Sequence, residues 1–133
     1  MVFHFSHLAA IVCAFLQCHA FYIGMTVVRV SSIEQFQHIR GNKVILYTAR
    51  NCQACKVVRP KFADLSEEWA STHIFCEFSI DCHESLLQEA QRLRIKTLPT
   101  ICVQQNRSDK ESTICVPVAQ SAKFEHVKAM LHI

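Results

Sequence analysis

Residues 43–48, KVILYT, constrain the fold more than any other segment, because they are apolar over almost their whole length. A strand with one face in solvent alternates apolar and polar residues, whereas a continuous apolar run is typical of a strand buried on both faces. Strands of this kind lie in sheets that have helices on both sides. The segment therefore predicts a central strand of an α/β domain.

Amphipathic segments and further short apolar runs alternate around this strand. Ser31-x-x-Glu34 has the pattern of a capping box at a helix start, and Gly41-Asn42 ends that helix. The residues NRSDKE at 106–111 predict a hairpin turn. The other predicted strands are residues 27–30, 73–80, 100–104 and 112–116, and the other predicted helices are residues 52–70, 84–93 and 123–131. The order β-α-β-α-β-α-β-β-α predicts an α/β fold with a central mixed sheet flanked by helices on both faces.

The first 24 residues contain no Lys, Arg, Asp or Glu, while all 14 basic and 11 acidic residues follow them. The apolar run at residues 8–16 has the length of a signal-peptide core, and residues 18–20 fit a small-x-small cleavage site. We therefore predict a signal peptide at residues 1–24, entry into the secretory pathway and one domain at residues 25–133. The alternative is translation from Met25, which would make the protein cytoplasmic. The apolar run is too short to span a membrane readily, so we expect no membrane association after leader removal.

Composition narrows the classes of ligand. The net charge is +3, and the basic residues form no cluster along the chain, so we expect no nucleic-acid binding. Two glycines are too few for a glycine-rich phosphate loop. Half of the residues are hydrophobic, which is ample for a core, and we expect a monomer.

Cys52 and Cys55 follow the central strand directly, in the segment RNCQACK at residues 50–56. We place Asn51 at the N-cap of the next helix, because its side-chain oxygen can accept a free amide hydrogen of the first turn. Cys52 is then the first helical residue. Cys55 lies one turn later on the same face, a separation that suits a disulfide.

The two sulfurs are predicted to differ in chemistry. The positive end of the helix dipole favours a thiolate, so the pKa of Cys52 should lie below the free value of about 8.5. Arg50 and Lys56 add positive potential. Cys55 lies deeper, where burial disfavours its anion. Cys52 is therefore the candidate nucleophile that attacks a substrate disulfide, and Cys55 is the candidate resolving thiol that releases the reduced product.

Other interpretations of the pair stay open. The two cysteines could form a static disulfide, or remain two core thiols. They could also supply half of a zinc site, which needs four ligands. Cys82-His83 would add two ligands at a spacing that matches no standard pattern, so we predict no metal.

The remaining cysteines of the predicted domain are assigned to the core or to a loop. Cys76 and Cys102 lie in apolar strand-like runs and are predicted to be buried. Cys82 follows a strand and is expected in an exposed loop, and Cys115 is expected in a strand.

Thr97-Leu98-Pro99-Thr100 stands directly before a predicted strand. A proline at this position cannot continue a hydrogen-bonded ladder and fits a tight turn. Its peptide bond is either cis or that of an ordinary loop proline.

These features together resemble the thioredoxin family. The resemblance covers residues 26–133 and is carried by the order of elements, Cys52-x-x-Cys55 at a helix start, Pro60 in the same helix, and Thr97-Leu98-Pro99-Thr100 before a strand. It implies a thioredoxin fold, with Cys52 as nucleophile, Cys55 as resolving cysteine and Pro99 as a cis-proline. The redox-active disulfide would join Cys52 and Cys55.

The resemblance also implies how substrates are bound and reduced. The backbone of Leu98 would pair with a bound peptide beside Pro99, and Gln53 and Ala54 would contact the substrate. The implied activity is thiol–disulfide exchange on protein disulfides, as in a protein-disulfide reductase. No cofactor is expected in the domain. The electrons would come from a thioredoxin reductase with NADPH or from glutathione.

Several positions depart from the family pattern. The departures are Asn51 for a Trp, Gln53-Ala54 for Gly-Pro, Leu46 for a buried acid of the preceding strand, and Val118 near an expected glycine. Because that acid moves the proton of the resolving cysteine, deprotonation of Cys55 should be slower here. This motivates an alternative function, a redox-poor binding module that recognises protein or peptide chains in the groove near Pro99.

Overall fold

The computed structural model of the chain describes residues 26–107 and 110–132. The predicted leader at residues 1–24 and the alternative start at Met25 lie outside the described residues. None of the helices in the described part combines the length and apolar character that crossing a bilayer requires.

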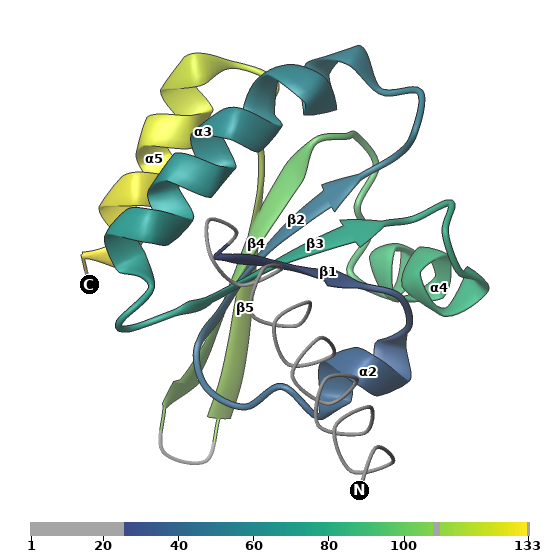
Figure 1. Cartoon of the computed structure of the whole chain (residues 1–133), viewed down its shortest axis with the longest axis horizontal. Coiled ribbons are helices and arrows are strands. Elements are labelled where there is room, and N and C mark those ends of the chain that lie inside the picture. Colours follow the sequence, from purple (N-terminus) through teal and green to yellow (C-terminus); the bar gives the residue numbers. More distant parts are fainter. Residues whose placement is uncertain (1–25, 108–109, 133) are drawn as a thin grey trace, which may run out of the picture.

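The order of elements confirms the predicted α/β fold. Along the chain the described elements are β1 (Val27–Val30), α2 (Ile33–Gln37), β2 (Lys43–Thr48), α3 (Gln53–Trp69), β3 (Ile74–Ser79), α4 (Glu84–Arg92), β4 (Thr100–Arg107), β5 (Lys110–Pro117) and α5 (Ser121–Leu131). The strands form one mixed sheet in the order β1-β3-β2-β4-β5 (Figure 1). β3 is parallel to β1 and β2, whereas β4 is antiparallel to β2 and β5.

The sheet has a hydrophobic core on each face. Every residue of the central strand β2 is buried, as its continuous apolar sequence predicts. Figure 1 shows α3 and α5 on one face of the sheet and α2 and α4 on the other. The first core includes Val44, Leu46, Phe62, Leu65, Phe75, Phe124 and Val127, and the second includes Ile45, Tyr47, Cys76, Phe78, Leu86 and Ala90.

The cysteine pair and the Pro99 turn lie at the same edge of the sheet. The parallel strands β1, β3 and β2 all end at this edge, and β2 leads there to Cys52. Because β4 runs in the opposite direction, it begins at the same edge, where Thr100 pairs with Tyr47. Pro99 therefore lies at the end of the sheet from which α3 starts.

Helix α2 begins one residue later than predicted. The N-cap is Ser32, whose Oγ accepts a hydrogen bond from the Gln35 amide at 3.3 Å, and not Ser31. Gln35 also accepts a hydrogen bond from the Ser31 amide at 2.7 Å. The shift occurs because Gln35, three residues after Ser32, takes the capping role that the sequence pattern assigned to Glu34.

The predicted hairpin is confirmed, but the predicted turn at residues 106–111 is too long. β4 and β5 continue through most of it, with Asn106 paired to Glu111 and Arg107 paired to Lys110. The Asn106 amide also donates to Asn42 Oδ1 at 3.1 Å. Polar side chains on an exposed hairpin do not prevent strand pairing, since the ladder is formed by the backbone.

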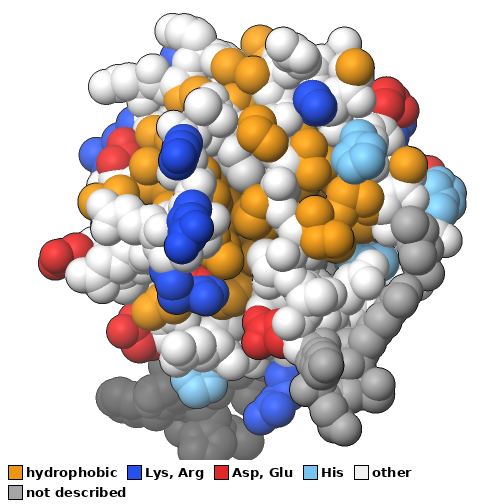
Figure 2. All heavy atoms as spheres, turned by 180° about the vertical axis from the view of Figure 1, so that it is seen from behind, with side chains coloured by type: hydrophobic (Ala, Val, Ile, Leu, Met, Phe, Trp, Pro, Cys, Tyr) orange, Lys and Arg blue, Asp and Glu red, His pale blue; other side chains and the backbone are white. Residues whose placement is uncertain are grey.

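The surface has a mixed character. Among the described residues, Val57, Leu87 and Ile114 are exposed large hydrophobic residues. On the face seen in Figure 2, hydrophobic side chains gather near the middle, with acidic and basic side chains around them. Neither sign of charge dominates that face.

Candidate active site

A disulfide joins Cys52 and Cys55 at the start of α3, with 5.2 Å between their Cα atoms. Cys52 is the N-cap of the helix, with extended backbone angles of −96° and 107°, so the prediction of Asn51 at this position is wrong by one residue. The Cys55 amide donates to Cys52 Sγ at 3.2 Å. The sulfur of Cys52 thus takes the place that an oxygen usually occupies in a helix cap.

The two sulfurs differ in exposure. Cys55 is fully buried, whereas Cys52 is half-buried and reaches the surface. Gln53 is exposed and Ala54 is half-buried between them. An incoming disulfide can therefore reach Cys52 and not Cys55.

The charges of α3 favour an anion at its start. The first turn contains Lys56 and no acidic residue, and the last turn contains Glu67 and Glu68 and no basic residue. The unpaired amides at a helix N-terminus carry partial positive charge, which stabilises a thiolate. The amide of Cys55 already points at Cys52 Sγ, so the same donor is in place for a thiolate when the disulfide opens.

The Leu98–Pro99 peptide bond is cis, which settles the choice that the sequence left open. Pro99 is buried and Leu98 is half-buried. Two hydrogen bonds hold this turn: Thr100 Oγ1 donates to the Thr97 carbonyl at 2.7 Å, and the Val118 amide donates to the Pro99 carbonyl at 3.0 Å. Val118, singled out because it stands near an expected glycine, is buried directly against this turn.

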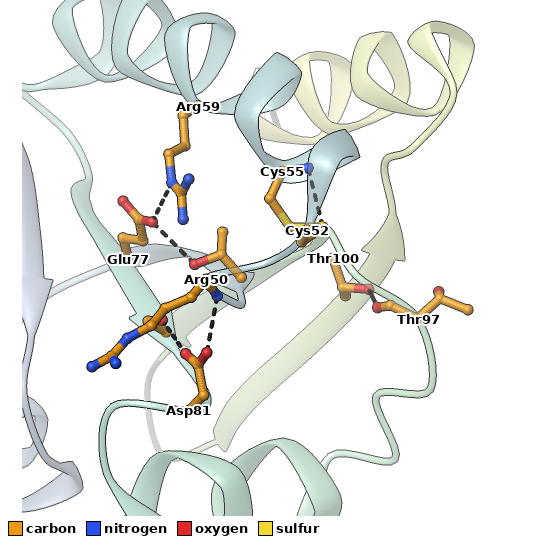
Figure 3. Close-up of a disulfide and its surroundings, with 10 residues drawn as sticks. Arg50, Cys52, Cys55, Arg59, Glu77, Asp81, Thr97 and Thr100 are labelled. Atoms are coloured by element: carbon orange, nitrogen blue, oxygen red, sulfur yellow. Dashed lines mark hydrogen bonds and ion pairs between the residues drawn. A yellow bond between two sulfur atoms is a disulfide. The ribbon is translucent and has the colours of Figure 1, made fainter.

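A buried carboxylate lies on the other side of the disulfide. Glu77 of β3 is 9% exposed and pairs across the sheet with Leu46, which is fully buried. Its Oε1 accepts hydrogen bonds from Thr48 Oγ1 at 3.0 Å and from Arg59 Nε at 2.7 Å. Figure 3 shows Arg59 and Glu77 on one side of the cysteine pair and Thr97 and Thr100 on the other.

Glu77 and Arg59 were not predicted as site residues from the sequence. The signal was a single carboxylate inside the apolar strand HIFCEFSI, together with an arginine one helical turn beyond Cys55. A buried carboxylate requires a partner. The ion pair supplies it and ties α3 to β3 next to the disulfide.

The loop after β3 is joined to the segment before Cys52. The Ser79 hydroxyl donates to Asp81 at 2.6 Å, and the Arg50 amide donates to the same carboxylate at 3.0 Å. These hydrogen bonds hold the pKa of Asp81 below its usual range. Asp81 therefore stays ionised next to Arg50 at neutral pH.

Comparison with known proteins identifies the family of this fold. The family model named Thioredoxin matches residues 27–126. The chain belongs to the thioredoxin family. A search among curated proteins gave no match. Family membership and the Cys52–Cys55 pair together support thiol–disulfide oxidoreductase chemistry in general.

Solved structures of thioredoxins share the fold. Malassezia sympodialis thioredoxin is 24% identical with a TM-score of 0.66, covering 80% of this chain and 91% of that chain. Schistosoma mansoni thioredoxin is 24% identical with a TM-score of 0.61, covering 80% and 98%. The Trx4 domain of ERdj5 is 15% identical with a TM-score of 0.65, covering 81% and 94%. At these identities the likeness concerns the fold alone.

This thioredoxin-family chain has a second disulfide, which the sequence analysis did not predict. Cys102 of β4 and Cys115 of β5 are directly opposite in the hairpin and are bonded. The burial predicted for Cys102 is confirmed, and Cys115 lies in a strand as expected. Cys102 belongs to the core on the α2 and α4 side of the sheet, and the half-buried Cys115 packs against that core.

The described residues contain no group of three or more His, Cys, Asp or Glu side chains arranged to hold a metal. His83, which was considered with Cys82 as a possible zinc ligand, caps a helix. It is the N-cap of α4, and its Nδ1 accepts a hydrogen bond from the Ser85 amide at 3.1 Å.

The two free thiols of the described part should react very differently. Cys82 is exposed, whereas Cys76 is fully buried, and burial raises the pKa of the Cys76 thiol to about 12. Since the thiolate is the nucleophile, iodoacetamide at about pH 8 should alkylate Cys82 and leave Cys76 unmodified in the folded protein. Peptide mass spectrometry checks this result. Adding denaturant should make Cys76 reactive, and equal labelling without denaturant would contradict its burial.

Proposed function

We propose that this chain is an oxidoreductase that exchanges disulfides with protein substrates through Cys52 and Cys55. The observation that carries the proposal is the unequal access to the pair. Cys52 reaches the surface at a helix N-terminus and receives an amide hydrogen bond, while Cys55 is buried behind it. A pair built in this way can accept one substrate sulfur and then expel it.

In the reducing direction, the Cys52 thiolate attacks one sulfur of the substrate disulfide. The substrate S–S bond breaks, its second sulfur leaves as a thiolate, and a mixed disulfide with Cys52 forms. Cys55 loses its proton and attacks Cys52 Sγ, which releases the first substrate sulfur as a second thiolate. The substrate has then gained two electrons, and Cys52 and Cys55 have been oxidised to a disulfide. The reverse sequence oxidises a substrate dithiol.

The surface around Pro99 is proposed to hold the substrate chain. The backbone of Leu98 would pair with an extended peptide, and Gln53 and Ala54 would lie against the residues next to its cysteine. Both residues of the first turn reach the surface, and the cis turn lies at the same sheet edge. Electrons for repeated reduction would come from outside the domain, from a thioredoxin reductase with NADPH or from glutathione.

We also propose that the protein works in the secretory pathway. The Cys102–Cys115 disulfide supports this location, because structural disulfides persist in oxidising compartments and are rare in the cytosol. The charge-free segment at residues 1–24 supports it independently. In that compartment the oxidising or isomerising direction is favoured.

The reduction potential of the Cys52–Cys55 pair tests the proposal. Purified protein is equilibrated in graded glutathione or dithiothreitol buffers, alkylated and analysed by peptide mass spectrometry. A value near about −180 mV, as in disulfide isomerases, is the expected result. A value near about −270 mV would assign the pair to reduction and argue against the secretory location. The absence of any reversible transition in this window would reject the oxidoreductase proposal.

One observation favours a second candidate function, a binding module with little turnover. Leu46 is fully buried and apolar at the position where the family places an acid, so no carboxylate from β2 can take the proton of Cys55. If Cys52→Ser retained the full biological effect of the protein, the binding module would replace the oxidoreductase.

A further inference from the structure

Two adjoining cavities form a groove beside the cysteine pair, with volumes of 410 Å³ and 370 Å³. Arg29, Arg59 and Glu77 line both cavities. Lys56, the residue after Cys55, lines the first, and Arg50, two residues before Cys52, lines the second. The groove therefore borders the active-site turn from both ends of the cysteine motif.

The groove lies on the opposite side of the disulfide from the cis-proline turn. In the sheet order, β4 with its preceding Pro99 is on one side of β2, and β3 and β1 are on the other. Glu77 and Arg29 belong to β3 and β1 and pair in register. Figure 3 shows the same division, with Arg59 and Glu77 on one side of the cysteines and Thr97 on the other. A substrate chain laid across Cys52 from the Pro99 side would continue toward the groove.

The groove carries an excess of positive charge. Its cationic lining residues are Arg29, Arg50, Lys56 and Arg59, while the carboxylates on or beside it are Glu77 and Asp81. Glu77 is 9% exposed and pairs closely with Arg59 at 2.7 Å, so that pair is internally neutralised. Arg29 is 4.0 Å from the same carboxylate, and its side chain is 73% exposed. Its guanidinium therefore remains available to a ligand.

We propose that this groove binds acidic residues of the substrate next to the cysteine under attack. The inference rests on the proposed function and names its substrate class. The substrates are proteins in which Asp or Glu directly precedes or follows a cysteine of the disulfide. The carboxylates would lie against the guanidinium groups of Arg29 and Arg50 and the ammonium of Lys56. Guanidinium groups bind carboxylates in a two-pronged geometry, which adds orientation to attraction.

The test compares peptide disulfides that differ only in the flank of one cysteine. The flank is acidic, neutral or basic, and the protein is the Cys82→Ser variant, so that Cys82 does not exchange. We expect kcat/KM for the acidic peptide to exceed that for the basic peptide by about tenfold at low ionic strength. The ratio should fall toward one as salt is added, because salt screens exposed charges. A ratio near one at low salt would overturn the inference.

Charge removal in the groove should change this ratio. Arg29→Ser should lower the acidic-to-basic ratio by about threefold, since one exposed ion pair is lost. The matched control is Arg40→Ser, which removes the same charge from an exposed position at the other end of β2. Equal effects of the two variants would show that net charge, and not the groove, sets the preference. The ratio is informative even if either variant alters the overall rate.

The neutral peptide separates this inference from the proposed function. Turnover of the neutral peptide with no preference for acidic flanks would reject the groove alone. If no peptide is turned over, the oxidoreductase proposal fails. The role of the groove is then tested by measuring peptide binding directly. Calorimetry with cysteine-free acidic and basic peptides should then still give about tenfold tighter binding of the acidic peptide. Equal binding would reject the groove.

Discussion

Replacing Cys52 by serine is expected to lower the rate of disulfide exchange at least about 1,000-fold, because the only accessible sulfur of the pair is lost. A serine hydroxyl at the same cap position can accept the Cys55 amide hydrogen, so the fold should be preserved. The rate is measured by reduction of a peptide disulfide with dithiothreitol as recycling reductant. Thermal unfolding of the variant checks that the fold is intact.

Cys55→Ser is the matched comparison. It removes the buried sulfur and leaves Cys52, so the first step should proceed and the second should not. The variant should accumulate a mixed disulfide between Cys52 and the substrate, visible by mass spectrometry without reductant. If Cys52→Ser kept its rate, or if Cys55→Ser trapped no substrate, the assigned roles of the two sulfurs would be wrong.

The double variant Cys102→Ala/Cys115→Ala is expected to lose about 3 kcal/mol of unfolding free energy. The bond closes a loop with a sequence separation of 13 residues, which restricts the unfolded chain. Removing buried sulfur also leaves space in the core on the α4 side. For a domain of this size the midpoint of thermal unfolding should fall by about 10 °C or more.

Urea denaturation without reductant measures this change. Cys82→Ser is the control, because Cys82 is exposed and unbonded, and its loss should change the free energy of unfolding by less than about 0.5 kcal/mol. A double variant as stable as this control would mean that the hairpin is held by strand pairing and packing alone.

Most of the architecture followed from local patterns. The apolar run of β2 identified the central strand, and alternation around it predicted the helices on both faces. The cysteine pair fell at a helix start because a buried strand ended directly before it. The exact cap residue did not follow, since Asn51 and Cys52 can both cap a helix and the choice depends on the turn that connects them to β2.

Predicting the Cys102–Cys115 bond requires the register between β4 and β5, which local sequence patterns do not specify. The predicted hairpin was nevertheless centred between residues 108 and 109, and a hairpin with that centre places Cys102 opposite Cys115, as observed. Extending the strands through the polar residues would have revealed the pairing. Glu77 required a different kind of information, because its partner Arg59 comes from a helix that packs on the sheet only after folding.

The charged residues at the two ends of α3 lower the stability of the helix, while the basic residue at its start favours a reactive thiolate. Lysine near the start and glutamates near the end oppose the helix dipole, each at a cost of about 0.3–1 kcal/mol at low ionic strength. The helix is therefore held mainly by its buried side, Val58, Phe62 and Leu65. Salt weakens the unfavourable end charges and the stabilisation of a Cys52 thiolate together. Rising ionic strength should thus make α3 more stable and Cys52 less reactive. Helix stability and the reactivity of the nucleophile would change in opposite directions.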